Sequence, residues 1–239
     1  MFETKKKFIK KLAPDFSVKE IDLIYKNTKR YYDASQSVIG LEMPEPLSCS
    51  DTEITFTFID DLSPKVSELW FVDQLWSTDL CNKLGTSLGS LHSAQEADLS
   101  KEIYLYGDYV PHNVVYRENK LIMFDVEPPM YRKSFDEFYR GLNYVDITSM
   151  LFFMLVGHSY KKPWQFFRNK KSLVQSYLTG YEETSNFEIN KHEIIFFLKK
   201  EFEFWYFDCG RRHGWFVKNV KYYFVYLVLL AQLLIYKVL

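Results

Sequence analysis

The chain has 239 residues, of which 47% are hydrophobic and 18% aromatic. This content is enough for a packed core in one domain or two small ones, and it excludes an intrinsically disordered chain. The 30 Lys and Arg residues nearly balance the 31 Asp and Glu residues, so the sequence lacks the general positive charge that favours nucleic acid as a partner.

The cysteines and the N-terminal residues indicate a cytoplasmic protein. The three cysteines (Cys49, Cys81 and Cys209) are far apart and form no C-x-x-C pair, which favours a reducing compartment and argues against a zinc site. Lysines near the N-terminus are not followed by an apolar segment or a small-residue cleavage site, so we do not expect a signal peptide.

The first 62 residues combine strands with one helix. A strand is predicted over Phe8–Leu12, and the capping-box pattern that begins at Ser17 and ends at Glu20 predicts a helix to about Tyr32. Their β-branched and aromatic content predicts two more strands, over Val38–Pro46 and Ile54–Ile59.

A second helix is predicted before the central segment of the chain. Leucines recur at helical spacing, at positions 80, 84, 88 and 91, and the pattern ends at His92 and Ser93. We expect His92 to pack or to cap this helix rather than to act in catalysis.

The segment Tyr104–Glu127 (YLYGDYVPHNVVYRENKLIMFDVE) is predicted to contain a short β-hairpin. Asp108 follows a glycine and precedes the first strand, Asn113 lies where that strand begins, and Asp125 lies where the return strand ends. A hairpin of this length brings its two ends together, so these three side chains are expected to converge. One carboxamide and two carboxylates suit magnesium. The alternative is an ordinary turn between two strands that leaves an exposed carboxylate.

The remainder of the chain is predicted to be helical. An apolar helix opens at Tyr144, and an aromatic helical region follows over residues 163–215. The apolar segment Tyr222–Tyr236 is shorter than the ~20 residues that span a bilayer. It is interpreted as a core helix or as a peripheral membrane contact helped by three lysines (Lys218, Lys221 and Lys237).

The order G-D-x-x-x-x-N, hairpin, F-D-x-E resembles the catalytic and metal-binding loops of the protein-kinase-like superfamily. The pattern is most similar to the branch of aminoglycoside phosphotransferases, choline kinase-like enzymes, lipopolysaccharide-core sugar kinases and RIO kinases. The resemblance implies an α+β, two-lobe fold. Residues 1–62 would form a truncated N-terminal β lobe, and residues 63–239 a mainly α-helical C-terminal lobe with the catalytic and metal loops.

The resemblance also implies roles for the converging residues. Asp108 would accept the proton of the acceptor hydroxyl, with Asn113 beside it in the catalytic loop. Asn113 and Asp125 would hold Mg²⁺, and Glu127 would hold a second metal ion or its waters. Tyr106 replaces the histidine that ties the catalytic loop to the metal-binding segment in relatives.

Further roles follow from the same resemblance. Lys10 matches the strand lysine that holds the ATP phosphates, unless it belongs to a solvated basic stretch. Glu20 matches the glutamate that pairs with that lysine, although the capping box already accounts for it. Ile59 and Asp60 begin the hinge, Ile59–Leu62, that would bind adenine through its backbone.

Five more residues have two possible interpretations each. Asp146 is either the aspartate that hydrogen-bonds the catalytic-loop backbone or a carboxylate at a helix N-terminus. His112 contacts phosphate or lies on the loop surface. Glu201, with Glu203 and Asp208, is either an acceptor contact or a solvated carboxylate.

The sequence departs from the family in its small lobe, because it contains no G-x-G-x-x-G loop and only nine residues precede Lys10. The predicted function is nevertheless an ATP- and Mg²⁺-dependent phosphotransferase that moves the γ-phosphoryl group to a hydroxyl of a small molecule or sugar. The alternatives are a pseudokinase that binds without turnover, and a protein kinase, which the absence of D-F-G and A-P-E elements disfavours.

Overall fold

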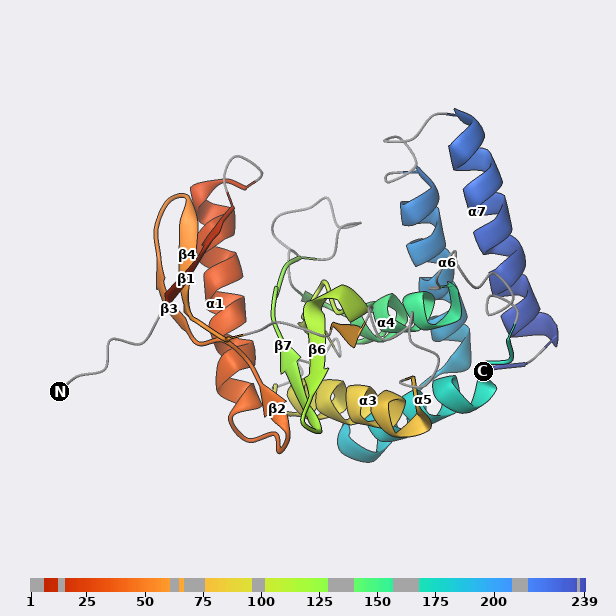
Figure 1. Ribbon diagram of the computed structural model, residues 1–239, viewed down its shortest axis with the longest axis horizontal. Coiled ribbons are helices and arrows are strands. Elements are labelled where there is room, and N and C mark those ends of the chain that lie inside the picture. Colours follow the sequence, from red (N-terminus) through yellow and green to blue (C-terminus); the bar gives the residue numbers. More distant parts are fainter. Residues whose placement is uncertain are drawn as a thin grey trace.

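The structure is a computed structural model that describes residues 7–12, 16–60, 65–66, 76–95, 102–128, 140–156, 168–207, 215–235 and 237–239. Within these ranges, three strands and one helix gather at one end of the molecule and the other helices at the opposite end, with a β-hairpin between them (Figure 1).

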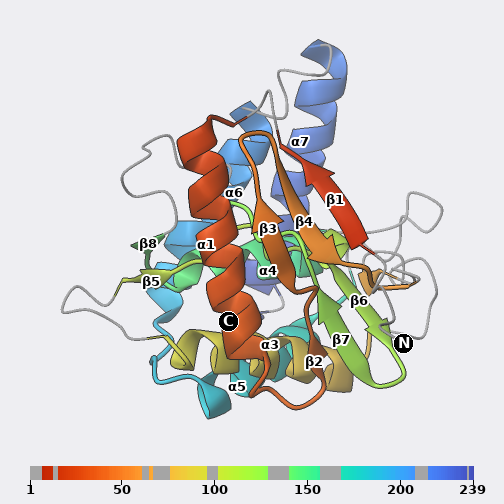
Figure 2. The same ribbon diagram turned by 90° about the vertical axis from the view of Figure 1, so that its left-hand side faces the viewer.

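The N-terminal end is an antiparallel sheet of three strands covered by one helix. The sheet has the order β1 (Lys7–Lys11), β4 (Glu53–Thr57) and β3 (Pro46–Cys49). Helix α1 (Val18–Ser35) packs against β3 and β4, as the turned view in Figure 2 shows. The strands predicted at Phe8–Leu12 and Ile54–Ile59 are confirmed within one or two residues.

The strand predicted over Val38–Pro46 is wrong. Helix α1 continues to Ser35, and a turn that includes Gly40 at φ 80° follows it. Only Leu41–Glu42 (β2) then forms a strand before Pro46 starts β3. Pro44 and Pro46 have no amide hydrogen, so this segment could not form a continuous strand.

Helix α1 connects the N-terminal sheet to the segment that precedes Gly107 and Asp108. The side-chain amide of Asn27 donates to the carbonyl oxygen of Leu105 at 2.8 Å, and the Tyr31 hydroxyl donates to that of Tyr104 at 2.7 Å. Both side chains lie on the buried face of the helix. The helix therefore supports the central segment of the chain.

The predicted hairpin is confirmed as β6 (Val114–Arg117) and β7 (Lys120–Met123). Its two-residue turn places Glu118 and Asn119 at φ 50° and 65°, the left-handed conformation of the tight turns that join antiparallel strands. Strand β7 also pairs with β2 in parallel, so the hairpin is attached to the N-terminal part of the chain. A one-turn helix, η1 (Pro111–Asn113), leads into β6.

The rest of the described chain is helical, apart from a short antiparallel pair, β5 (Ile103–Tyr104) and β8 (Arg140–Gly141). The helices are α3 (Thr78–Ser93), α4 (Tyr144–Val156), α5 (Lys171–Thr184), α6 (Lys191–Phe207) and α7 (Trp215–Leu230), followed by a π-helical turn, η4 (Ala231–Ile235). The helices predicted at positions 80–93 and from Tyr144 are confirmed.

Helices α3 and α5 pack closely because small residues line their contact. A side chain at Gly85 would collide with the carbonyl oxygen of Tyr177 on α5, and Gly180 on α5 meets α3 in the same way. The leucines of the predicted stripe are fully buried, and they join one hydrophobic core with residues of α1, α4 and the hairpin. The loops that flank the hairpin pack on this core through Tyr106, Tyr109 and Val126.

The C-terminal helix begins earlier than predicted, at Trp215, and ends in η4. One side of the helix packs inward, where Tyr222, Val228 and Leu229 are buried. Tyr223 and Leu227 on the helix are exposed. Among the described helices, none combines the length and the hydropathy required to cross a membrane.

Candidate active site

The loop before β6 brings Asp108 and Asn113 together, as the sequence predicts. The side-chain nitrogen of Asn113 donates to Asp108 Oδ2 at 2.7 Å and to the Asp108 carbonyl oxygen at 3.0 Å. These bonds close the loop on itself and fix the rotamer of the carboxylate. They also direct the amide nitrogen of Asn113 to Asp108, which leaves its Oδ1 as the atom suited to bind a cation.

The return strand of the hairpin ends at a backbone turn that presents Asp125. The Phe124 amide donates to the Asn113 carbonyl oxygen at 3.1 Å, so the two ends of the hairpin meet. Asp125 then adopts φ 70°, a left-handed conformation that aspartate tolerates better than most residues. The convergence of the hairpin ends is therefore confirmed.

Lys10 reaches this position from the N-terminal sheet. Its ammonium group forms ion pairs with Asp125 and with Glu127, and the three side chains are between 20% and 33% exposed. Lys10 and Asp125 are 115 positions apart in the chain. The ion pairs thus join β1 to the segment that follows the hairpin, and Lys10 is not part of a solvated basic stretch.

The charges of this group shift the titration of its members. Burial raises the pKa of Asp108 to about 6, and the carboxylates of Glu127 and Asp125 add to the shift, whereas the Asn113 hydrogen bond and Lys10 oppose it. Burial lowers the pKa of Lys10, but Asp125 and Glu127 together raise it above its ordinary value. Lys10 therefore remains an ammonium ion at neutral pH.

Asp146 accepts hydrogen bonds from the backbone of the loop that leads to Asp108, as one of the two interpretations of this residue expected. Its carboxylate accepts hydrogen bonds from the amides of Tyr106 and Gly107, both at 2.7 Å. Asp146 is fully buried, and His92 Nε2 lies 3.0 Å from its Oδ2. His92 packs at the end of α3, as predicted, and it also supports the aspartate.

Gly107 is a position that only glycine fits. Its φ is 90°, and a side chain there would collide with the carbonyl oxygen of Glu127. The catalytic loop and the segment that carries Glu127 therefore pass each other backbone to backbone. This close contact explains the G-D order of the motif, because the residue before Asp108 must have no side chain.

The other predicted residues do not join the Lys10–Asp125 group. Glu20 forms the capping box, in which its carboxylate accepts a hydrogen bond from the Ser17 amide at 2.6 Å. The resemblance implied an ion pair between Glu20 and Lys10, but Lys10 pairs with Asp125 and Glu127 instead. Asp60 is exposed and its carbonyl oxygen accepts from Arg117 at 3.2 Å, while Ile59 is half-buried. The last two residues of the predicted hinge, 61 and 62, lie outside the described part of the chain.

His112 is exposed, which agrees with a position on the loop surface, and its ring centroid lies 5.6 Å from that of Phe153 on α4. Glu201 is buried rather than solvated: its Oε1 lies 2.6 Å from the Ser149 hydroxyl. Glu203 is half-buried and pairs with Lys200 at 3.4 Å. Asp208 lies outside the described residues.

Sequence reasoning missed a buried network behind the catalytic loop. The Tyr181 hydroxyl lies 2.9 Å from His92 Nδ1 and accepts a hydrogen bond from Asn143 at 2.9 Å. These residues come from α3, from α5 and from the position just before α4, so no local pattern links them. The only available signal was the presence of single polar residues within apolar helices.

The central side chains suit a hard cation without forming a complete cage. Carboxamide and carboxylate oxygens are the donors that Mg²⁺ prefers, usually together with substrate phosphates and water. Within the described part of the chain, no group of three or more His, Cys, Asp or Glu side chains is arranged to hold a metal ion. A magnesium ion bound here would therefore combine Asn113, Asp125 and Glu127 with phosphate oxygens.

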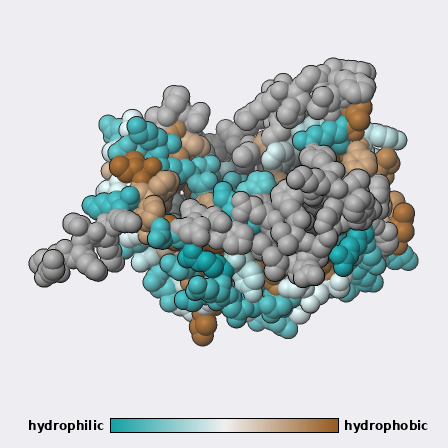
Figure 3. Space-filling view, viewed as in Figure 1, coloured by the Kyte–Doolittle hydropathy of each residue, from teal (hydrophilic) through white to brown (hydrophobic). Residues whose placement is uncertain are grey.

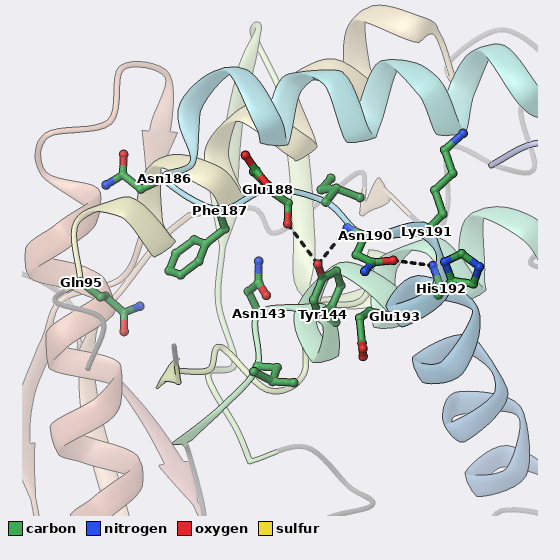
Figure 4. A pocket seen from close by; sticks show the side chains of 12 residues that line it. Gln95, Asn143, Tyr144, Asn186, Phe187, Glu188, Asn190, Lys191, His192 and Glu193 are labelled. Carbon is green, nitrogen blue, oxygen red and sulfur yellow. Dashed lines mark hydrogen bonds between the residues drawn. The ribbon is translucent and has the colours of Figure 1, made fainter. Parts of the chain in front are cut away.

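A separate cavity of about 1180 Å³ lies elsewhere in the helical region (Figure 4). It is lined by the end of α3, the start of α4 and the segment between α5 and α6. Tyr144 crosses it, donating to the Glu188 carbonyl oxygen at 3.0 Å and accepting from the Asn190 amide at 2.9 Å. None of the predicted site residues lines this cavity.

Comparison with known proteins defines the fold. No protein-family model matches the chain, and no curated protein matches its sequence. Among solved structures, it is similar to an amicoumacin kinase in complex with AMP-PNP, Ca²⁺ and Ami, with a TM-score of 0.55 and 13% sequence identity. The similarity covers 86% of this chain and 77% of that chain. The predicted fold is thus confirmed: a small β-sheet region and a mostly helical region form a kinase-like, two-lobe α+β fold.

Proposed function

We propose that this protein is a phosphotransferase that uses ATP and Mg²⁺ to phosphorylate a hydroxyl of a small molecule or sugar. One observation carries the proposal. Lys10 of the N-terminal sheet meets Asp125 and Glu127 of the helical lobe, next to the bonded pair Asp108 and Asn113. The group joins a lysine, two carboxylates, a carboxamide and a base, which are the elements of phosphoryl transfer.

Each residue has a proposed role. Asp108, held by Asn113, orients the acceptor hydroxyl and accepts its proton. Lys10 neutralises phosphate charge, and Asn113 and Asp125, with Glu127, provide oxygen ligands. Bound magnesium would supply the neutralisation of phosphate charge that this transfer requires. Ile59 and Asp60 would start the segment that binds the adenine.

The ligands of the solved neighbour agree with the proposed nucleotide and divalent cation. Its complex contains AMP-PNP, Ca²⁺ and Ami, a combination that agrees with a nucleotide–metal site and a small-molecule acceptor. The sequence identity of 13% supports the fold alone, so the acceptor of this chain is open to direct screening.

A pseudokinase is the second candidate, because the sequence contains no G-x-G-x-x-G loop to cover the phosphates. In that case the protein would bind a nucleotide or a partner without turnover. A protein kinase is the third candidate, and Asp125-Val126-Glu127 in place of D-F-G disfavours it.

The first experiment measures thermal stability with ATP, in the presence and absence of Mg²⁺, for the wild type and Asp125→Asn. We expect a magnesium-dependent rise in Tm in the wild type that is lost in the variant, because a ligand that binds only the folded state stabilises it. Glu118→Gln, in the exposed hairpin turn, is the matched control and should respond like the wild type.

The outcomes separate the candidates. A magnesium-dependent stabilisation without turnover on any tested hydroxyl acceptor would favour the pseudokinase. If neither protein is stabilised by ATP at saturating concentrations, the proposed nucleotide site is wrong.

A further inference from the structure

The cavity of about 1180 Å³ in the helical region has an apolar wall. Leu142, Phe187 and Ile189 line it, and all three are half-buried and pack against the hydrophobic core. Tyr144 adds the surface of its ring, because its hydroxyl already has two hydrogen bonds to the segment between α5 and α6 (Figure 4). On the face of the molecule in Figure 3, by contrast, hydrophobic residues are exposed in separate groups with hydrophilic residues between them. The wall gathers apolar side chains from separate parts of the chain at one place.

The segment between α5 and α6 is held in place beside the cavity. The Asn186 amide donates to the Ser93 hydroxyl at 3.0 Å, and this hydroxyl donates to the Thr184 carbonyl oxygen at 2.8 Å. The side chain of Asn190 accepts from the His192 amide at 2.9 Å, at the start of α6. A ligand would therefore meet a wall that is already formed, and little of its binding free energy would be spent on ordering this segment.

Asn143 provides the polar group of the cavity. It is 4% exposed, and Figure 4 shows its side chain between those of Phe187 and Tyr144. Its side-chain nitrogen donates to the Tyr181 hydroxyl at 2.9 Å, whereas none of the described residues donates a hydrogen bond to its Oδ1. A buried amide oxygen without a donor is unfavourable, so this atom favours a ligand that carries an N–H or O–H group.

The orientation of the Asn143 amide follows from the hydrogen bonds behind it. Asp146 accepts from two backbone amides, and its carboxylate also accepts from His92 Nε2, 3.0 Å away. A neutral imidazole that donates from Nε2 accepts at Nδ1, here from the Tyr181 hydroxyl at 2.9 Å. The Tyr181 oxygen then accepts from the nitrogen of Asn143, which leaves Oδ1 as the amide atom available to the cavity.

The charges around the cavity do not select an ion. Glu188 and Glu193 line it together with Lys191, so both signs are present. Glu188 and Lys191 are exposed, where water and salt screen their charges. None of the residues proposed for phosphoryl transfer lines the cavity. The lining therefore favours an uncharged ligand that differs from both the nucleotide and its acceptor.

We propose that this cavity binds a small uncharged molecule that combines an aromatic ring with an N–H or O–H group. The ring contacts Tyr144, Phe187 and Ile189, and the donor bonds Asn143 Oδ1. Small-molecule sites are mostly apolar with a few placed polar groups and have volumes of roughly 300–1,000 Å³, so this cavity is large enough for such a ligand. The proposal does not depend on phosphotransferase activity.

Benzamide is the probe for the test, because it is uncharged and joins an aromatic ring to an N–H donor. Methyl benzoate has the same ring and a similar size without a donor, and acetamide has the donor without the ring. Ligand-observed NMR titrations of the full chain should show binding of benzamide. Methyl benzoate should bind about fivefold more weakly, because a hydrogen bond to a buried group contributes about that factor. Acetamide should show no measurable binding.

Two isoleucines provide matched variants. Ile189→Trp fills the cavity, so it should weaken benzamide binding at least ~10-fold. Ile195→Trp places the same ring on α6 at a position that is 47% exposed and outside the lining, and it should bind like the wild type. Circular dichroism establishes that both variants are folded. Nuclear Overhauser effects between benzamide and the rings of Tyr144 and Phe187 locate the probe in the wild type without any variant.

Four results would overturn the proposal. The first is absence of benzamide binding to the wild type up to the solubility limit of the probe. The second is equal binding by the two tryptophan variants, or Overhauser effects to residues outside the cavity. The third is equal affinity for benzamide and methyl benzoate, which would remove the hydrogen bond to Asn143. The fourth is displacement of benzamide by Mg²⁺-ATP, which would place the probe in the nucleotide site.

Discussion

The Tyr106 hydroxyl donates a hydrogen bond to the carbonyl oxygen of Phe124 at 2.5 Å, which joins the catalytic loop to the residue before Asp125. Tyr106 is completely buried, and its ring packs edge-on against that of Tyr31 on α1. The tyrosine thus makes the connection that the resemblance assigns to a histidine in relatives. Its longer side chain reaches the backbone next to Asp125 directly.

Loss of this hydroxyl should destabilise the protein. Tyr106→Phe leaves the Phe124 carbonyl oxygen without its donor, which costs about 1–3 kcal/mol and lowers Tm by several degrees. Tyr116→Phe is the control, because its hydroxyl bonds the exposed Asn119 side chain at 3.0 Å. Thermal unfolding checks the pair. Equal Tm values for the two variants would show that the buried bond contributes nothing.

Substitutions of Lys10 and of its neighbour Lys11 should have very different effects on stability and on ATP binding. Successive strand residues point to opposite sides, so Lys10→Met removes both ion pairs, whereas Lys11→Met alters an exposed side chain. We expect Lys10→Met to lower stability by about 1 kcal/mol, because solvent screens these pairs. It should also weaken ATP binding at least ~10-fold. Isothermal titration measures the affinity, and similar affinities for both variants would remove Lys10 from the site.

Substitutions of Asp108 and Asp125 should have different effects on turnover and on ATP binding. Asp108→Asn removes the proposed base, so we expect turnover to fall ~10²-fold or more while ATP binding is nearly unchanged. Asp125→Asn should lose magnesium-dependent binding as well. Steady-state kinetics with a responsive acceptor, together with titration of Mg²⁺-ATP, checks both. Full activity in both variants would contradict the assignment.

Glu201 should make stability depend on pH. Burial raises its pKa from 4.5 to about 7, with the charge of Asp108 contributing. The Ser149 hydroxyl lies 2.6 Å from Glu201 Oε1 and 3.0 Å from the Val145 carbonyl oxygen, and it has one proton to donate. A protonated Glu201 can donate to Ser149 and so satisfy all three groups.

The stability of the fold should decrease as the pH rises, because the pKa of Glu201 is higher in the folded state than in the unfolded state. Below about pH 4.5 both states are protonated, and as the pH rises to 7 the unfolded state loses its proton first, which destabilises the fold by up to about 3 kcal/mol. Glu201→Gln should therefore gain Tm relative to the wild type between pH 5 and pH 8. Parallel Tm curves would contradict the raised pKa.

The sequence by itself determined the local features of this protein. The segment Tyr104–Glu127 predicted the hairpin, and the hairpin predicted that Asp108, Asn113 and Asp125 converge. The leucine stripe predicted α3, and the S-x-x-E pattern predicted the start of α1. These features depend on residues near each other in the chain, so local rules were sufficient.

Only the tertiary structure decided which distant residues meet. Lys10 had two interpretations until β1 brought it to Asp125 and Glu127. The His92–Tyr181–Asn143 network and the burial of Glu201 likewise depend on the packing of separate helices. Ion pairs and buried hydrogen bonds between such elements have no spacing in the sequence, because their geometry is set when the core forms.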